Sequence, residues 1–259
     1  SFIRLYNIYD FHGKSSIIVH MSGHSKWANI KRKKEATDKI KGTVFAKLSR
    51  LITLATTEGG GIPDPEHNFK LRLIMDKAKS LNMPKENIER AIEKASGGDK
   101  TLFKEAMYEG FGPHGVAILV YATTDNPNRT VNEIKNCFEQ HGGKLGAQGA
   151  VSYLFTRCGL VEFDMQSNSE EDVFNFAQSM DAIDIDKIES SYYVYIPFDH
   201  FGKIKEHLNT MKPTLSEVDY KPTTSITLSD ENQSQHATKL IEALEELDDV
   251  HKVFSNLNV

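Results

Sequence analysis

The spacing of the apolar residues changes near residue 98 of this 259-residue chain, and that change constrains the fold more than any other feature. Before it, apolar residues recur three or four positions apart, which is typical of amphipathic helices. After it, short apolar runs of strand length alternate with helical segments. We therefore predict an α+β protein in which an N-terminal three-helix domain precedes a part built on sheets.

Three helices are predicted in the first part of the chain. The first begins near Ile40 and stops at the glycine triplet 59–61. The second keeps helical spacing over 71–81. The third begins at Pro84, because a proline in the first turn of a helix loses no needed hydrogen bond. Three short helices in succession predict a small bundle.

The second part predicts two interleaved units. Residues 157–221 read strand, helix, strand, strand, helix, strand, which is the split βαβ arrangement of a ferredoxin-like fold. The flanking segments hold further strands and helices without a complete sheet of their own, so we expect them to pair with each other. The predicted organisation is an N-terminal extension (1–20), a basic helical domain (21–97), a discontinuous α/β domain (98–156 plus 222–259) and an inserted ferredoxin-like α/β domain (157–221).

The same patterns lead to four local expectations. Residues 150–155 are predicted to form a strand, and residues 199–208 a single helix. Thr130 is expected to cap the helix that follows the turn DNPNRT. The carboxylates of 245–249 are expected to form a solvated, solubilising cluster.

Charge divides the chain at the same point as the apolar period. The chain has 31 Lys+Arg and 36 Asp+Glu. Residues 1–98 hold 18 of the basic and 10 of the acidic residues, a formal charge of +8. Residues 99–259 hold 13 basic and 26 acidic residues, a formal charge of −13. The formal net charge of −5 therefore hides a basic front part. We expect the acidic part to face away from any polyanion that the basic part contacts.

The densest basic segment is 22–50, with nine Lys/Arg against Glu35 and Asp38. Four consecutive cations, 31–34, would point around most of a helix, so they cannot all form one solvated back face. Contact with phosphates, without sequence choice, is the function that they favour. A lysine-rich soluble surface is the alternative, and Trp27 either stacks on a base or anchors the core. The candidate nucleic-acid-binding residues are Lys26, Trp27, Lys31, Arg32, Lys33, Lys34, Lys39 and Lys41.

Three glycine-rich loops are candidates for close approach to a partner. The second loop matches GxGxxG, but its glycines lead into a strand rather than a helix, which favours a hairpin turn over a dinucleotide-binding loop. Turn geometry is the alternative explanation for all three loops. The candidates are Gly59, Gly60, Gly61, Gly110, Gly112, Gly115, Gly142 and Gly143.

The sequence holds no motif for catalysis, metal binding or membrane insertion. No GxSxG, HExxH or P-loop occurs, and two cysteines without CxxC spacing cannot build a cysteine zinc site. The longest apolar run, 116–122, is far shorter than the roughly 20 residues of a membrane-spanning helix. We therefore expect a cytoplasmic protein with no enzyme activity, metal, cofactor, small-molecule substrate or membrane partner.

Several motifs, in order along the chain, resemble one known family. MSGHSKWANIKRKK, LNMPKENIERAI, YEGFGPHG, DNPNRT and GGKLGAQGAVSYLF together are similar to the YebC/PmpR family and its relative, the mitochondrial translational activator of cytochrome c oxidase. The resemblance begins at Met21 and runs to the C-terminus. It implies a helical domain followed by two ferredoxin-like domains, one interrupted by the other. It also implies a role in gene expression, through promoter DNA or the ribosome.

Between these two partners, the residues favour ribosomal RNA. A sequence-specific reader of duplex DNA usually offers Arg, Asn or Gln on a recognition helix, whereas the predicted helices offer mainly Lys and aliphatic residues. We expect a nucleic-acid-binding regulator that associates with the ribosome, with a promoter-binding transcriptional regulator as the alternative. An enzyme or ligand sensor and a purely protein-binding adaptor are the further alternatives.

Overall fold

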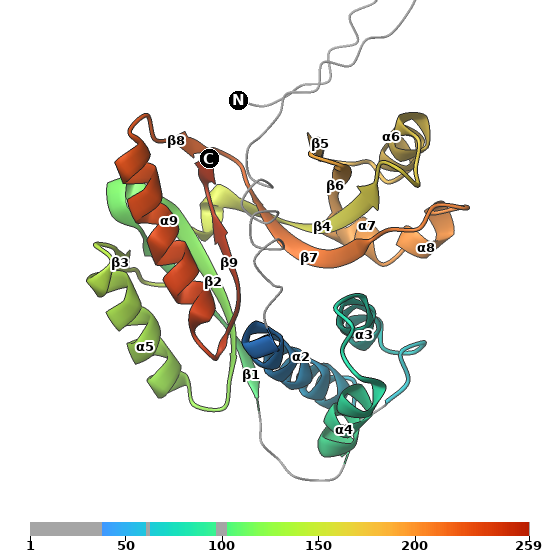
Figure 1. The fold of residues 1–259 in the computed structure, drawn as a ribbon, viewed down its shortest axis with the longest axis horizontal. Helices are drawn as coiled ribbons and strands as arrows, with labels where there is room; N and C mark the ends of the chain where they lie inside the picture. The colour runs from blue at the N-terminus through green and yellow to red at the C-terminus, as the bar shows by residue number, and fades with distance from the viewer. Residues whose placement is uncertain (1–37, 61–62, 97–102, 259) are drawn as a thin grey trace, which may run out of the picture.

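Helices come first in this protein, and two antiparallel sheets with their covering helices follow (Figure 1). The computed structural model describes residues 38–60, 63–96 and 103–258. The order of the elements confirms the α+β fold predicted from the change of apolar period. The boundaries predicted at 156/157 and 221/222 stay a prediction, and one strand runs across each of them.

The first three described helices form the predicted bundle. Their buried apolar faces meet in one cluster that includes Ile52, Leu71 and Ile88. Asn68 joins two of the helices, since its side chain accepts a hydrogen bond from the Leu71 N–H and donates one to the carbonyl of Ala55. The helices are α2 (Asp38–Glu58), α3 (Phe69–Ser80) and α4 (Lys85–Ser96).

The first sheet has the strand order β3-β1-β2-β9. Its strands are β1 (Lys104–Phe111), β2 (Ala117–Thr124), β3 (Lys144–Leu145) and β9 (Val250–Ser255). The helices α5 (Pro127–Gln140) and α9 (Glu231–Glu246) cover one face (Figure 1). The pairing of β2 with β9 joins segments far apart in sequence, as expected for the flanking segments.

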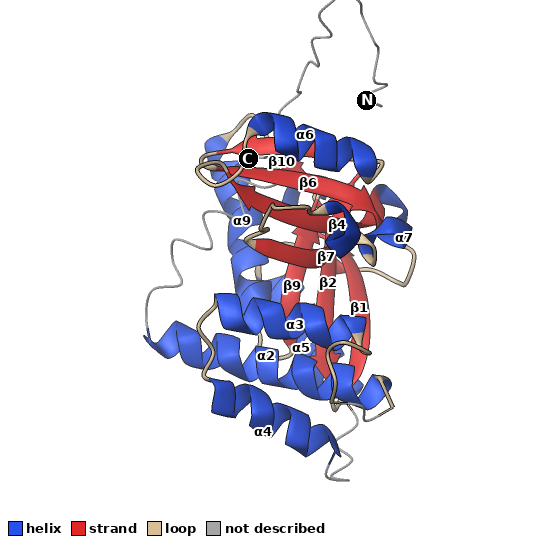
Figure 2. Ribbon diagram, turned by 90° about the vertical axis from the view of Figure 1, so that its right-hand side faces the viewer, coloured by secondary structure: helices blue, strands red, loops and turns tan. Residues whose placement is uncertain are grey.

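The second sheet has the order β5-β6-β4-β7, with every neighbouring pair antiparallel. With its helices it forms the predicted ferredoxin-like unit (Figure 2). The core of this unit includes Phe163, Phe176 and Phe201. Its strands are β4 (Phe155–Asp164), β5 (Asp184–Ile188), β6 (Ser191–Pro197) and β7 (Leu215–Pro222). Its helices are α6 (Glu170–Ser179), α7 (Phe198–Phe201) and α8 (Ile204–His207).

Short elements complete the chain. A 3-10 turn, η1 (Pro113–Gly115), connects β1 to β2, so the GxGxxG glycines belong to a hairpin as predicted. A second 3-10 turn, η2 (Ser152–Leu154), precedes β4. The short strands β8 (Ile226–Thr227) and β10 (Leu257–Asn258) pair in parallel near the C-terminus.

Two of the local predictions are wrong. Residues 150–155 do not form a strand: η2 occupies 152–154, and β4 begins only at Phe155. The reason is that the carboxylate of Glu109 accepts the N–H groups of Val151 and Ser152, which are therefore unavailable to a neighbouring strand. Residues 199–208 form two short helices instead of one, and Gly202, a poor helix former, follows the first.

We predict that Gly110→Ala destabilises the protein by roughly 1–3 kcal/mol, the usual effect of overfilling a core. A Cβ at Gly110 would lie 2.7 Å from two ring atoms of Phe138 and 2.8 Å from the carbonyl oxygen of Lys144. The matched control is Gly42→Ala on α2, where no atom lies within 4 Å. That change should stabilise by about 0.5–1 kcal/mol. Urea unfolding measures both, and an unchanged midpoint for Gly110→Ala would contradict the packing.

Candidate nucleic-acid interface

The predicted nucleic-acid-binding residues lie at the N-terminal end of α2 and before it. Two of them, Lys39 and Lys41, belong to the first turn of α2, although their side chains are not among those described. The other six lie outside the described residues: Lys26, Trp27, Lys31, Arg32, Lys33 and Lys34. The described part therefore shows how the helix that continues this basic segment is held.

Two cations of α2 hold that helix against the end of α9. Lys47 Nζ donates a hydrogen bond to the carbonyl of Glu245 at 2.7 Å. Arg50 Nη1 donates to the carbonyl of Asp248 at 2.8 Å and to Asp249 Oδ1 at 2.9 Å. Carbonyls at the C-terminal end of a helix carry partial negative charge, so cations are favoured there. The basic helix is thereby docked on the acidic part of the chain.

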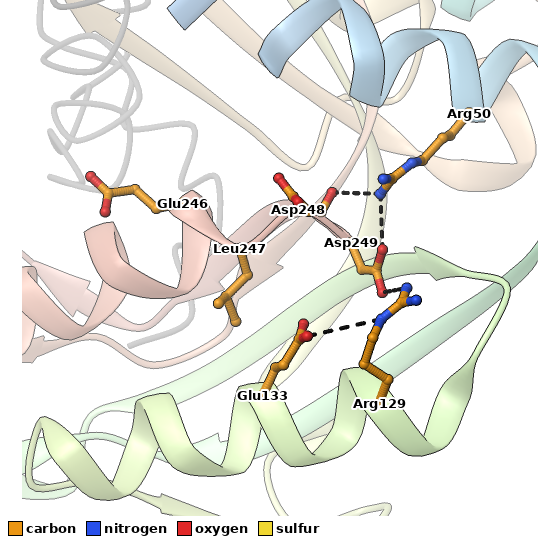
Figure 3. Close-up of a pocket in the computed structure, with 7 residues that line it drawn as sticks. All are labelled: Arg50, Arg129, Glu133, Glu246, Leu247, Asp248 and Asp249. Atoms are coloured by element: carbon orange, nitrogen blue, oxygen red, sulfur yellow. Dashed lines mark hydrogen bonds and ion pairs between the residues drawn. The ribbon is translucent and has the colours of Figure 1, made fainter.

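Asp249 is the centre of this junction, and only 2% of its surface is exposed. Besides Arg50, its carboxylate accepts a hydrogen bond from Arg129 of α5 at 2.7 Å (Figure 3). It accepts another from Thr130, also on α5, at 2.6 Å. Burial by itself would raise the pKa of Asp249. The bonds from Thr130 and Arg129 outweigh burial and hold the pKa below its usual value. Asp249 therefore stays ionised and joins α2, α5 and the turn before β9.

Two sequence predictions fail at this junction. The acids of 245–249 are not simply a solubilising cluster, because Asp249 is buried and ion-paired. Thr130 does not cap α5: Asn126 is the N-cap, and its side chain accepts a bond from the Arg129 N–H at 3.2 Å. The Thr130 hydroxyl bonds to Asp249 instead. Both errors arise because the partners are about 120 residues apart in sequence.

Cations of α3 pair with carboxylates of both sheets. Lys77 Nζ lies 2.5 Å from Glu217 Oε2 on β7, and Lys252 of β9 lies 2.7 Å from the other oxygen of Glu217. Burial works to raise the pKa of Glu217, but Lys252 and Lys77 lower it far below its usual value. Lys70 Nζ lies 2.5 Å from Glu105 on β1. The docked helices therefore pair their cations with the acidic part of the chain. That the acidic part faces away from a bound polyanion stays a prediction.

His251 lies at the same junction, at a bulge in β9. Tyr121 pairs with Lys252 and Ala122 with Val250, which leaves His251 as the extra residue. Its Nε2 atom is buried without a hydrogen-bond partner among the described residues. Burial lowers the pKa of His251 to about 3, with help from the nearby cations Lys47, Arg50 and Lys77. The imidazole is therefore neutral at physiological pH.

A shallow cavity of about 540 Å³ opens at this junction. Figure 3 shows the residues that line it: Arg50, Arg129, Glu133, Glu246, Leu247, Asp248 and Asp249. Both of its guanidinium groups already bind carboxylates, because Arg50 contacts Asp249 and Arg129 contacts Asp125, Asp249 and Glu133. The cavity therefore lies where α2, α5 and the end of α9 meet, and both of its cations are paired within the protein.

The structure brings two of the three glycine loops together, at one end of the first sheet. Gly112 of the hairpin and Gly143 after α5 both lie against Leu240 of α9. A Cβ added at Gly112 would lie 3.3 Å from Leu240 Cδ2, and one added at Gly143 would lie 3.0 Å from the same atom. Gly110 lies beside the Lys144 carbonyl, and Gly115 and Gly142 have positive φ. Gly59 and Gly60 lie elsewhere, at the end of α2, and Gly61 is outside the described residues. Approach of these glycines to a partner stays a prediction.

Neither a metal centre nor a membrane span is found in the part of the chain that the structure describes. No group of three or more His, Cys, Asp or Glu side chains within it could hold a metal ion. None of its helices is long and apolar enough to cross a bilayer.

The helical bundle, the two antiparallel sheets with their helices and the ion-paired junction define a class of three-domain proteins, and comparison with known proteins agrees. Residues 25–98 match the model described as the TACO1/YebC protein N-terminal domain. Residues 103–257 match the one described as the TACO1/YebC second and third domain. The chain belongs to the TACO1/YebC family, which confirms the resemblance inferred from the motifs.

Individual relatives match over nearly their whole length. A protein of Aquifex aeolicus named probable transcriptional regulatory protein is 43% identical over 242 residues, covering 92% of this chain and 96% of its own. One of the same name from Geobacillus thermodenitrificans is 44% identical over 243 residues, covering 92% and 97%. The crystal structure of a conserved hypothetical protein from Aquifex aeolicus superposes with a TM-score of 0.82 at 42% identity, covering 90% and 96%.

We predict that Asp249→Ala lowers the free energy of unfolding by roughly 2–4 kcal/mol. The change removes a buried carboxylate and leaves its three hydrogen-bond donors without their acceptor. Glu246→Ala is the matched control, since Glu246 lines the same cavity but is exposed. It should change stability by less than about 0.5 kcal/mol. Urea unfolding measures both variants. Equal effects of the two changes would show that Asp249 does not join the domains.

His251 gives the protein a predictable loss of stability in mild acid. Its pKa is about 3 in the folded state and about 6.5 in the unfolded state, so the unfolded chain binds the proton first. The free energy of unfolding should therefore fall below about pH 6.5, by about 2 kcal/mol at pH 5. His251→Gln should lack this loss, and urea unfolding across that pH range measures it. Carboxylates with lowered pKa values, such as Asp249, lose their contribution only at lower pH. A steep loss that persists in His251→Gln would contradict the assignment.

Proposed function

We propose that this protein is a non-enzymatic regulator of gene expression that binds nucleic acid through the basic segment 26–41. That segment carries seven Lys/Arg against Glu35 and Asp38. Such a cluster binds phosphates by releasing condensed counterions, without reading sequence. The proposal rests on one observation: seven Lys/Arg fall within residues 26–41 of the sequence, at the start of a helix that is docked on the rest of the protein.

The docked group is used within the protein. Arg50, Lys70 and Lys77 each bind a carboxylate of the sheet-containing part, at 2.5 to 2.9 Å. These contacts fix α2 and α3 on the two sheets. Segment 26–41 leads directly into α2, so a polyanion bound to the segment is connected to the protein body through a helix that ion pairs hold in place.

Ribosomal RNA is the partner that we favour, which makes the protein a ribosome-associated translation factor. The basic segment offers six lysines and a single arginine, Arg32. Lysine contacts phosphate as a point charge, whereas base edges in a duplex are read mainly by Arg, Asn and Gln. Binding without sequence choice suits a large folded RNA better than one operator among many competing sites.

A DNA-binding transcriptional regulator is the second candidate. The observation in its favour is the name of the relatives from Aquifex aeolicus and Geobacillus thermodenitrificans, probable transcriptional regulatory protein. Both candidates use the same basic segment and differ in the polyanion. They are separated by specificity: a translation factor of this kind should show little discrimination among duplex sequences.

We predict that reversing Lys31, Arg32, Lys33 and Lys34 to Glu abolishes co-sedimentation with ribosomal particles at low salt. In filter binding to RNA, the slope of log affinity against log salt should become shallower by about three, because roughly 0.7–0.9 of a unit is lost per phosphate contact. The matched control reverses four lysines that are exposed elsewhere: Lys203, Lys205, Lys212 and Lys239. That variant should keep most of the affinity.

Three results would change the conclusion. Operator-specific, nanomolar binding of duplex DNA at physiological salt would replace the ribosome by promoter DNA. Equal losses in the two charge-reversed variants would show that net charge, and not the segment, governs binding. Full activity of the reversed segment variant would favour a protein-binding adaptor.

A further inference from the structure

A loop around the end of β1 is held by one buried carboxylate. We call residues 144–154 the Glu109 loop. The backbone carbonyl of Glu109 accepts the N–H of Gly146 at 2.8 Å. Its carboxylate accepts the N–H groups of Gly149, Val151 and Ser152, each at 2.8 Å. Burial alone would raise the pKa of Glu109, but these three donors outweigh it and lower the pKa. The carboxylate therefore stays charged and orders the loop.

The far end of the loop is anchored as well. Val151 is fully buried in the cluster that includes Leu119 and Phe254. The carbonyl of Leu154 accepts bonds from both the N–H and the hydroxyl of Thr223, at 2.8 and 3.0 Å. The loop therefore has a set conformation before any partner arrives. A preorganised loop loses little conformational entropy on binding, which raises affinity.

This ordered loop presents an aromatic side chain to solvent. Tyr153, on η2, is 71% exposed, the highest value among the large hydrophobic residues of the described part. Phe111, 39% exposed, pairs with Lys144 where β1 meets β3. A single exposed apolar residue is ordinary on a protein surface. Here the loop is fixed at both ends. Val151, just before η2, and Leu154, its last residue, pack in the core cluster, while Tyr153 between them stays exposed.

Charge around the loop differs from the rest of the acidic part. Residues 140–161 contain no Asp or Glu, although residues 99–259 hold 26 of them. Within that stretch, Lys144 and Arg157 are exposed. This stretch of sequence therefore offers an approaching polyanion two exposed cations and no acid, within a part of the chain whose net charge is −13.

We propose that the Glu109 loop binds single-stranded RNA by stacking an unpaired base on Tyr153, with Lys144 contacting the adjoining backbone. This inference rests on the proposed function and adds a second contact, outside the basic segment. Unpaired bases are the part of RNA that aromatic side chains recognise, because bases inside a duplex are already stacked on each other. The glycines of the loop let its backbone lie close to the ligand.

The test is filter binding of a short single-stranded oligouridylate and of an RNA duplex of equal length to the full chain. Tyr153→Ala should weaken binding of the single strand roughly five- to 150-fold, the range for one base–aromatic stack, and leave the duplex unchanged. Tyr153→Phe should bind like the unmodified protein. Ile183→Ala is the surface control, since Ile183 is 45% exposed and lies just before β5, away from the Glu109 loop in sequence. Thermal unfolding should show that all three variants fold.

Crosslinking provides a second, direct measurement. Oligouridylate containing 5-iodouridine, irradiated with the protein, should attach to the peptide that contains Tyr153, and mass spectrometry identifies the site. A crosslink confined to other peptides, or an affinity of Tyr153→Ala equal to that of the unmodified protein, overturns the inference. Equal weakening for the duplex also overturns it, because stacking on an unpaired base would then not be the contact.

The two proposals fail in different ways. Suppose that the unmodified protein binds RNA, that the reversed segment variant does not, and that Tyr153→Ala binds normally. The Glu109-loop contact is then wrong, and the proposed function stands. If the unmodified protein binds neither RNA nor ribosomal particles, the proposed function is wrong and the loop contact falls with it. Loss of affinity in both variants supports both proposals.

Discussion

The buried carboxylate of Asp249 is the contact on which the arrangement of the domains depends. It accepts hydrogen bonds from Arg50 of the helical bundle and Arg129 of α5, at 2.9 and 2.7 Å (Figure 3). A third bond comes from Thr130 of α5, at 2.6 Å. A carboxylate that is 2% exposed and unpaired would be costly, so the three donors must stay near it. The position of α2 relative to the first sheet is therefore set at this point.

This contact changes the meaning of the charge asymmetry. Totals of +8 and −13 suggest two parts that use their charges separately. In the structure, Arg50, Lys70 and Lys77 of the basic part form ion pairs with carboxylates of the acidic part. Some of the charge of each part is therefore neutralised by the other. Charge pairs that include a buried group are screened by salt less than exposed pairs, so docking around Asp249 should persist as the salt concentration rises.

Glu109 and Asp249 show the same use of an acidic residue. Each is nearly buried, 5% and 2% exposed, and each is satisfied by donors from distant parts of the chain. Asp249 orders the joint between domains, and Glu109 orders the loop that carries Tyr153. Acids of this kind count toward the negative total but add little negative surface. The acidic part of the chain is therefore less uniformly repulsive to nucleic acid than its composition suggests.

The sequence by itself determined most of the elements, because each of these depends on spacing within a few residues. The helices α2, α3, α4 and α9, the GxGxxG hairpin and the ferredoxin-like order all follow from local apolar periods and glycine or proline signals. Only the tertiary structure decided the roles of Asp249, Thr130 and residues 150–155. Their backbone or side-chain partners lie about 40 to 200 residues away, and no local pattern encodes which distant donor meets a buried carboxylate.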